Sequence, residues 1–278
     1  MENHRKLTRR RQRRRIGSWF VATFGAVYPI AIGVDRIGGQ AKTYMDSISG
    51  VFGLTTADFA AIAFFGFIFG LIIRRTAGNP TFALAVEPVL DVLRQHAFVD
   101  EYAQSDPEHH HRATLFRHCP RKFWIWPFRK WYSPWGASFR GPWAGWLIPI
   151  SRSGHTTKHS DTTFLAPDDA DNAEGVAGMI WASKQDVRPI RLVLDGPDDA
   201  QKYAEETNVS TDYVLKQLEE EKPLPLSLSG FPVFRGGQIW GVVVLDSRRT
   251  DGIKPPDQNF RAIRITQSLL DKYVSRYT

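Results

Sequence analysis

Residues 227–247 read SLSGFPVFRGGQIWGVVVLDS, and this stretch gives the clearest indication of the fold class. Two runs rich in strand-forming residues, 227–234 and 239–246, flank the dipeptide Gly236-Gly237, which is typical of a hairpin turn. The continuous apolar run 242–245 indicates that the second strand is buried on both faces. We therefore expect a β-hairpin whose second strand lies in the centre of a sheet.

The segments on either side of this hairpin alternate between helical and extended patterns. Helices are expected over 81–103, 173–183, 197–221 and 263–274, and strands over 113–119, 146–151 and 187–194. This mixed order predicts an α+β domain over residues 76–278, with an antiparallel sheet flanked by helices.

Residues 16–75 contain two apolar runs. The run 16–34 carries no charge and is long enough to span a bilayer as a helix. The run 59–73 reaches that length only if it is extended back to residue 54, which brings in Asp58. We expect two transmembrane helices that form a hairpin over 16–75. A signal peptide cleaved near Gly39-Gln40-Ala41 is the alternative.

The positive charge of the chain is concentrated in its first fifteen residues. Eight basic residues stand there against Glu2, which gives 8 − 1 = +7, the formal net charge of the whole chain. The eight are Arg5, Lys6, Arg9, Arg10, Arg11, Arg13, Arg14 and Arg15. The remainder sums to zero, so we expect no direct binding of nucleic acid.

The same charges predict an orientation. The basic tail 1–15 and the pair Arg74-Arg75 flank the two apolar runs, whereas the connecting stretch has only Arg36 and Lys42. Cytoplasmic flanks of membrane helices are enriched in Lys and Arg. The expected location is therefore the cell inner membrane, multi-pass, with both termini cytoplasmic and the lipid bilayer as a partner.

Small residues recur one helical turn apart in both apolar runs. Gly66 and Gly70 form a G-x-x-x-G pattern, and Ala22 and Ala26 form a looser one. Such pairs let helix backbones approach closely, so we expect helix packing at these residues and a homo-oligomer. Chance spacing is the alternative.

The stretch 119–146 combines aromatic rings with cations and contains no acid. It holds Trp124, Trp126, Trp131, Trp135, Trp143 and Trp146, together with Arg121, Lys122, Arg129, Lys130 and Arg140. This mixture suits contact with lipid headgroups or with another subunit. Packing within its own domain and stacking on nucleobases are the alternatives.

The sequence shows no arrangement typical of catalysis or of metal binding. Cys119 is alone, so neither an internal disulfide nor a zinc site built from cysteine pairs can form. The consecutive residues His109, His110 and His111 point in different directions on any regular element, which favours a solvated loop. Asp246-Ser247 is expected to cap the turn after its strand. We expect no enzyme activity, no cofactor and no metal.

Residues 230–234 (GFPVF) and 240–247 (WGVVVLDS), joined by the Gly-Gly turn, resemble the end of a GAF domain. Upstream, 173–181 (AEGVAGMIW) resembles the helix that lines the ligand pocket in that family, and 147–154 (LIPISRSG) stands where a pocket-edge strand is expected. The resemblance covers about residues 84–278. The insertion at 119–146 departs from the family, as does the absence of a bilin-attachment cysteine.

This resemblance implies a module that senses a ligand or dimerises. Arg152, His155 and Lys158 form a cationic group beside the implied pocket edge, and Trp181 ends the implied pocket helix. These four residues are the expected ligand-binding residues, and they suit an anionic small molecule such as a nucleotide. A charged surface loop is the alternative.

Three functions follow from these features. The preferred hypothesis is a membrane-anchored sensor or signalling protein whose GAF-like domain binds a small ligand or dimerises. Its alternative is a membrane-disrupting effector of a bacterial anti-phage defence system, activated when a ligand drives oligomerisation. The third is an anchored scaffold whose domain binds nothing.

Overall fold

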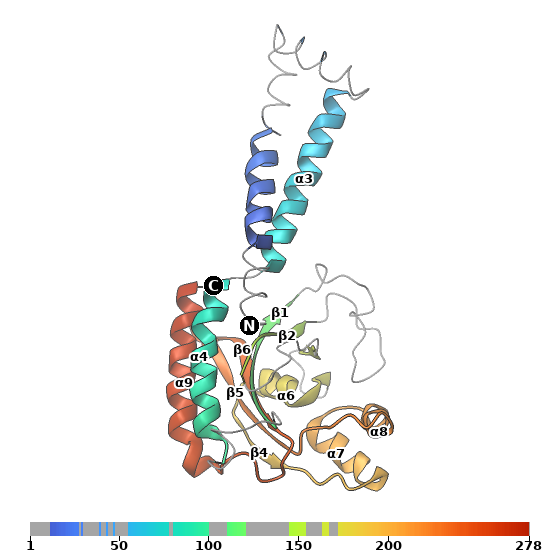
Figure 1. The fold of residues 1–278 in the computed structure, drawn as a ribbon, viewed down its shortest axis with the longest axis vertical. Coiled ribbons are helices and arrows are strands. Elements are labelled where there is room, and N and C mark those ends of the chain that lie inside the picture. Colours follow the sequence, from blue (N-terminus) through green and yellow to red (C-terminus); the bar gives the residue numbers. More distant parts are fainter. Residues whose placement is uncertain are drawn as a thin grey trace. The chain divides into compact units, whose positions relative to one another are not determined.

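The computed structural model describes residues 12–27, 29, 39, 43, 47, 55–77, 80–99, 110–120, 145–153, 163–166 and 172–277. They belong to two compact units, Met1–Pro80 and Thr81–Thr278 (Figure 1). The Trp-rich stretch 121–144 lies outside the described residues, as do most of the expected external loop 35–53 and the tail 1–11.

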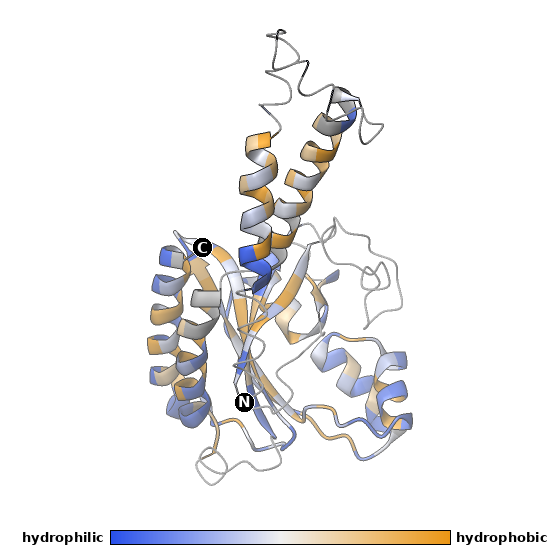
Figure 2. Ribbon diagram, turned by 45° about the horizontal axis from the view of Figure 1, so that its top comes forward, coloured by the Kyte–Doolittle hydropathy of each residue, from blue (hydrophilic) through white to orange (hydrophobic). Residues whose placement is uncertain are grey.

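The first unit contains a helix over residues 12–27 and α3 (Thr56–Ala77). Apolar residues dominate both helices, and hydrophilic residues begin the first (Figure 2). The two helices contact each other through Phe20 and Phe69, whose ring centroids are 5.8 Å apart. The start of α3 is capped reciprocally, because Asp58 Oδ2 accepts from Thr55 N at 2.7 Å and Thr55 Oγ1 accepts from Asp58 N at 3.2 Å.

No helix within the described residues combines the length and the apolar character that crossing a bilayer requires. The helical residues 12–27 include three arginines, Arg13, Arg14 and Arg15, in their first turn. α3 carries Asp58 near its start and Arg74 and Arg75 near its end. This finding contradicts the expected pair of transmembrane helices and the expected location in the inner membrane with both termini cytoplasmic.

The second unit is an α+β domain built on one six-stranded sheet, which confirms the expected fold class. The strands are β1 (His111–Cys119), β2 (Trp146–Ser153), β3 (Phe164–Leu165), β4 (Val187–Arg191), β5 (Ser227–Arg235) and β6 (Gln238–Ser247). Their spatial order is β3-β2-β1-β6-β5-β4, and every neighbouring pair is antiparallel.

Helices cover both faces of this sheet (Figure 1). One face packs against α4 (Pro80–Ala97) and α9 (Pro256–Tyr277), and the other faces α6 (Gly175–Ser183), α7 (Ala200–Thr207) and α8 (Thr211–Glu219). We call them the α4–α9 face and the α6–α8 face. The domain therefore has three layers and two hydrophobic cores.

The expected hairpin is present, with β6 between β1 and β5. Successive residues of a strand point to opposite faces of its sheet. Val243 and Leu245 accordingly belong to the core under α4 and α9, and Val242 and Val244 to the core under α6–α8. The continuous apolar run thus reflects a strand that is buried on both sides, as expected.

The single helix expected over 197–221 is wrong. The segment instead forms a short 3-10 turn (Pro197–Asp199), then α7 and α8. The break is local: Asn208 adopts a left-handed conformation (φ 53°), and Ser210 begins a new helix by accepting from Tyr213 N at 3.2 Å. The helix expected over 81–103 ends earlier, at Ala97, because Phe98 pairs with Ile253 as a β-bridge.

Candidate functional site

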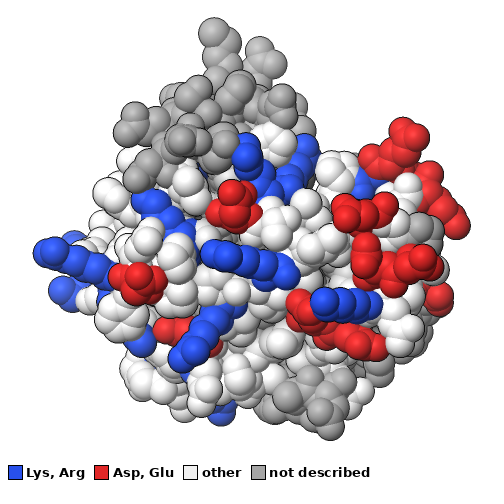
Figure 3. Space-filling view, turned by 90° about the horizontal axis from the view of Figure 1, so that it is seen from below, with Lys and Arg blue, Asp and Glu red and all other residues white. Residues whose placement is uncertain are grey.

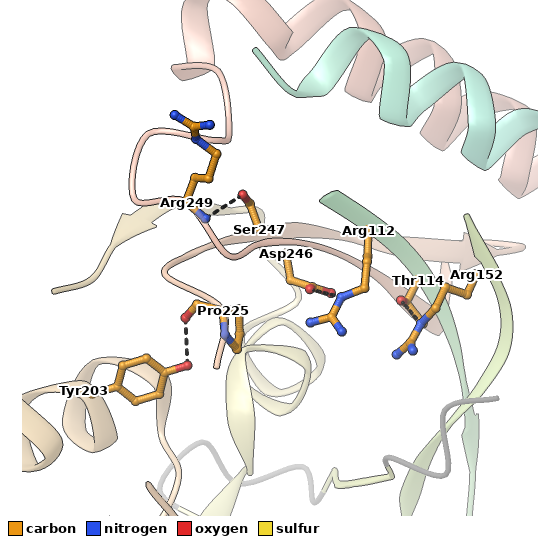
Figure 4. A network of polar contacts seen from close by, with 8 residues as sticks. All are labelled: Arg112, Thr114, Arg152, Tyr203, Pro225, Asp246, Ser247 and Arg249. Atoms are coloured by element: carbon orange, nitrogen blue, oxygen red, sulfur yellow. Dashed lines mark hydrogen bonds and ion pairs between the residues drawn. The ribbon is translucent and has the colours of Figure 1, made fainter. Parts of the chain in front are cut away.

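Four polar residues meet on the α6–α8 face, at the end of the sheet where β1 begins. They are Arg112 and Thr114 from β1, Arg152 from β2 and Asp246 from β6, and we call them the arginine cluster (Figure 4). The register explains their meeting, since Arg112 stands opposite Asp246 and Thr114 stands opposite Arg152. Alternation along β1 places its even-numbered residues on this face.

Arg112 and Asp246 form the ion pair of the cluster. The Arg112 Nε donates to Asp246 Oδ1, and the two side chains are 17% and 9% exposed. A carboxylate this deeply buried is costly unless it is paired and hydrogen-bonded. Arg112 therefore compensates the charge of Asp246 in the folded domain.

Arg152 is bound differently. Its Nε donates to Thr114 Oγ1 at 3.0 Å, and Thr114 is buried. Burial lowers the pKa of Arg152, the neighbouring Arg112 lowers it further, and Asp246 opposes both. Among the residues that the structure describes, no carboxylate forms an ion pair or hydrogen bond with Arg152. The cluster holds two guanidinium groups and one carboxylate, a net charge of +1.

Two tyrosines lie on the same side of the sheet. The Tyr203 hydroxyl donates to the carbonyl oxygen of Pro225 at 2.9 Å (Figure 4). Burial raises the pKa of Tyr203, and the nearby negative charge of Asp246 raises it further. Burial also raises the pKa of Tyr213 to about 12, with a contribution from Glu220. Both phenols therefore stay neutral at physiological pH.

The other end of the α6–α8 face is aromatic. The rings of His118 on β1 and Trp181 on α6 are stacked, with centroids 3.8 Å apart and planes inclined by 18°. Phe116 contacts Phe164 edge-on at 5.4 Å. Thr114 and His118 are four residues apart on β1, which corresponds to about 13 Å along the strand. The face thus has a cationic end and an aromatic end.

α6 lies close to the sheet because Gly230 has no side chain. A Cβ atom at this position of β5 would lie 2.6 Å from Ile180 Cδ1 of α6 and would collide with the carbonyl oxygen of Val243. Ile180 is fully buried in the core of this face. The glycine therefore allows the close approach of α6 to β5.

The structure brings one of the four expected ligand-binding residues into the arginine cluster. Arg152 lies in the cluster, and Trp181 lies on the same face but at the aromatic end. His155 and Lys158 fall outside the described residues. Sequence reasoning missed Arg112 and Thr114, although their alternation with Ala113 and Leu115 is the pattern of a strand with one polar side.

Two expectations about polar residues need correction. His111 does not lie in a solvated loop: it begins β1, is fully buried, and its ring lies 4.8 Å from that of Phe98. Asp246 does not cap the turn, because it pairs with Arg112. The expected cap is confirmed at Ser247, since its Oγ accepts from Arg249 N at 3.0 Å (Figure 4).

The four residues expected to pack membrane helices lie in the first unit. A Cβ atom on Gly66 would lie 2.7 Å from Phe24 Cγ, and one on Gly70 would lie 2.6 Å from Phe20 Cβ, so both glycines face the helix over 12–27. Ala22 and Ala26 are exposed on that helix. Over the described part of the chain, no three His, Cys, Asp or Glu side chains are grouped as metal ligands.

Comparisons with known proteins give little more. No family model and no curated protein matches the chain. Among solved structures, it is similar to a type II free methionine-R-sulfoxide reductase from Thermoplasma acidophilum, at 10% identity over 69% of this chain and 96% of that one, with a TM-score of 0.34.

A second similar structure is the phycoerythrobilin-bound GAF domain of a cyanobacterial phytochrome. The identity is 9% over 71% of this chain and 92% of that one, again with a TM-score of 0.34. At these identities and scores, neither similarity carries an argument about fold or function. The α+β assignment rests on the strands and helices of this chain, and the candidate site rests on its own side chains.

Proposed function

We propose that the second unit is the ligand-binding module of a signalling protein and is not an enzyme. In this proposal, a small molecule binds on the α6–α8 face of the sheet, next to the arginine cluster. The observation that carries the proposal is the cluster itself, in which Arg152 is largely removed from water without a carboxylate of its own among the described residues. Such an arrangement is costly for the free domain and becomes favourable when a ligand supplies the missing interactions.

Ser153, the residue after Arg152, links the proposed binding site to α4. Ser153 follows Arg152 on β2, so its side chain points to the opposite face, where its Oγ donates to Asp91 Oδ1 on α4. A shift of β2 on ligand binding would therefore act on α4 through this hydrogen bond. α9 is tied to the sheet in a similar way, since Gln267 Nε2 donates to Pro232 O at 2.7 Å.

The charge of the outer surface favours a small ligand over a polyanion. Residues 195–221, which include α7 and α8, contain nine acids and two lysines, so their sum is 2 − 9 = −7. Many of these acids are exposed, and Figure 3 shows acidic side chains gathered along one side of the molecule. A nucleic acid would be repelled there. A nucleotide is the ligand class that the GAF resemblance suggests.

Thermal unfolding of the full chain tests the proposal. The panel should contain nucleotides, nucleosides, amino acids, small carboxylates and their neutral analogues. We expect at least one compound to raise the unfolding midpoint in a concentration-dependent manner. We propose that self-association is the output, so the mass of the particles should change with the same compound. If no compound in the panel raises the midpoint, the proposed function is wrong.

A further inference from the structure

The two arginines of the cluster are not equivalent. The charge of Asp246 acts on Arg152, but the carboxylate of Asp246 is bonded to Arg112 Nε. Arg152 has only the neutral hydroxyl of Thr114 as its hydrogen-bond partner among the described residues. A guanidinium has five N–H donors in a planar fork, and within the described part of the chain only the Nε of Arg152 has a bonded partner.

We infer that Arg152 binds an oxyanion, a carboxylate or phosphate group of the ligand, and that Arg112 is a positioning residue that neutralises Asp246. This inference rests on the proposed function and names the chemistry of its ligand. An oxyanion can accept two parallel bonds from one guanidinium, and such charge-assisted bonds are stronger than bonds between neutral groups. It would also bring the net charge of the cluster from +1 to zero or below.

Thr114 is the second positioning residue. It is buried opposite Arg152 in the β1–β2 register, and its Oγ1 accepts the Nε bond. This bond restrains the orientation of the guanidinium. Figure 4 shows that the guanidinium groups of Arg112 and Arg152 both project from the same face of the sheet. An anion at Arg152 would therefore also experience the field of Arg112.

The division of roles predicts opposite effects on the unliganded protein. Removing Arg112 leaves the buried carboxylate of Asp246 without its partner, so the domain loses stability. Removing Arg152 together with the Thr114 hydroxyl eliminates a poorly solvated cation and leaves no unpaired polar group. The double variant Arg152→Met/Thr114→Val should therefore unfold at the same midpoint as the parent protein or at a higher one in buffer without oxyanions.

Matched pairs of probes test the charge requirement on the full chain. The phosphate arm compares adenosine 5′-monophosphate with adenosine, and inorganic phosphate serves as the minimal probe. The carboxylate arm compares succinate with its diamide. We expect the charged member of at least one pair to bind and its neutral partner to bind at least about tenfold more weakly, since a charged hydrogen-bonded contact is worth roughly 1.5–3 kcal/mol.

Variants at Arg152 then test whether this residue binds the charged probe. Arg152→Gln should lower the affinity for the charged probe by about tenfold or more. Arg152→Lys should retain part of that affinity because it keeps the charge. Arg188→Gln, at an exposed position of β4, is the matched control and should bind as the parent does.

The outcomes separate this inference from the proposed function. If neutral compounds of the wider panel bind as well as charged ones, or if Arg152→Gln binds the charged probe unchanged, the inference is wrong and the proposed function stands. If no compound binds, the proposed function falls as well. A large loss of stability in Arg152→Met/Thr114→Val would also overturn the inference, because Arg152 would then be a structural residue.

Discussion

Arg112 and Asp246 face each other across neighbouring strands, and the Arg112 guanidinium donates to the Asp246 carboxylate although 134 residues separate them in the chain. This ion pair lies at the cationic end of the α6–α8 face and links β1 to β6 there. Its contribution to the free energy of unfolding can be isolated by mutating each residue alone and both together.

The single variants Arg112→Met and Asp246→Asn should each lower the free energy of unfolding by about 3 kcal/mol, because each leaves a poorly solvated polar partner behind. The double variant should lose less than the sum of the two. Urea unfolding followed by circular dichroism measures all four proteins. Strictly additive losses would show that the two side chains do not interact.

Gly230 should tolerate no side chain. Gly230→Ala would push its Cβ into Ile180 and the Val243 carbonyl, so the strand or α6 must shift. We expect a loss of about 3 kcal/mol in the free energy of unfolding. Gly196→Ala is the control, because a Cβ atom at that position meets nothing within 4 Å. Equal midpoints for the two variants would contradict the close packing of α6 on β5.

The buried tyrosines predict a loss of stability at alkaline pH. The pKa of Tyr213 is raised to about 12 in the folded domain, above the ordinary value of about 10. Between these values the unfolded chain loses the proton and the folded chain keeps it, so the free energy of unfolding falls as pH rises. Below about pH 10 the contribution is fully present.

Tyr203 acts in the same direction, since burial raises its pKa too. Tyr203→Phe/Tyr213→Phe should therefore show a shallower fall of stability between pH 10 and 12 than the parent protein. Denaturant midpoints measured at steps of half a pH unit give the pH dependence of stability for the variant and for the parent protein. Identical slopes would mean that neither phenol is protected from ionisation by the fold.

The helix pair of the first unit predicts a crosslink. A Cβ atom on Gly66 would lie 2.7 Å from Phe24 Cγ, which is near the place a cysteine sulfur would occupy. In a Cys119→Ser background, Phe24→Cys/Gly66→Cys should form an intramolecular disulfide on mild oxidation. Phe24→Cys/Ala61→Cys is the control, because Ala61 is exposed on α3. Intact-mass measurement detects the bond, and similar yields for the two pairs would argue against the observed packing.

Local signals in the sequence were enough for much of the fold. The Gly236-Gly237 turn and the apolar run 242–245 predicted the hairpin and its central strand, both of which the structure contains. The break between α7 and α8 was missed because it depends on one left-handed residue, Asn208, inside a charged helical pattern. β3 was missed because two residues carry no periodicity.

The site was less predictable, for a physical reason. Arg152 was identified from its charge beside an expected strand, whereas its neighbours Arg112 and Asp246 come together only through the register of β1 on β2 and β6. Nothing in the local sequence specifies that register across such long separations. The transmembrane expectation failed although the apolar runs are clear in the sequence. Within the described residues no helix has the length and apolar character of a span, and α3 carries Asp58, Arg74 and Arg75 near its ends.

In this proposal Arg152 serves a ligand and not the fold. The most direct test is the unfolding midpoint of Arg152→Met/Thr114→Val beside that of the parent protein, each with and without the charged probe that binds best. We expect the variant to be at least as stable as the parent without the probe and not to be stabilised by the probe. A variant that is much less stable alone, or that the probe stabilises as strongly as the parent, would contradict it.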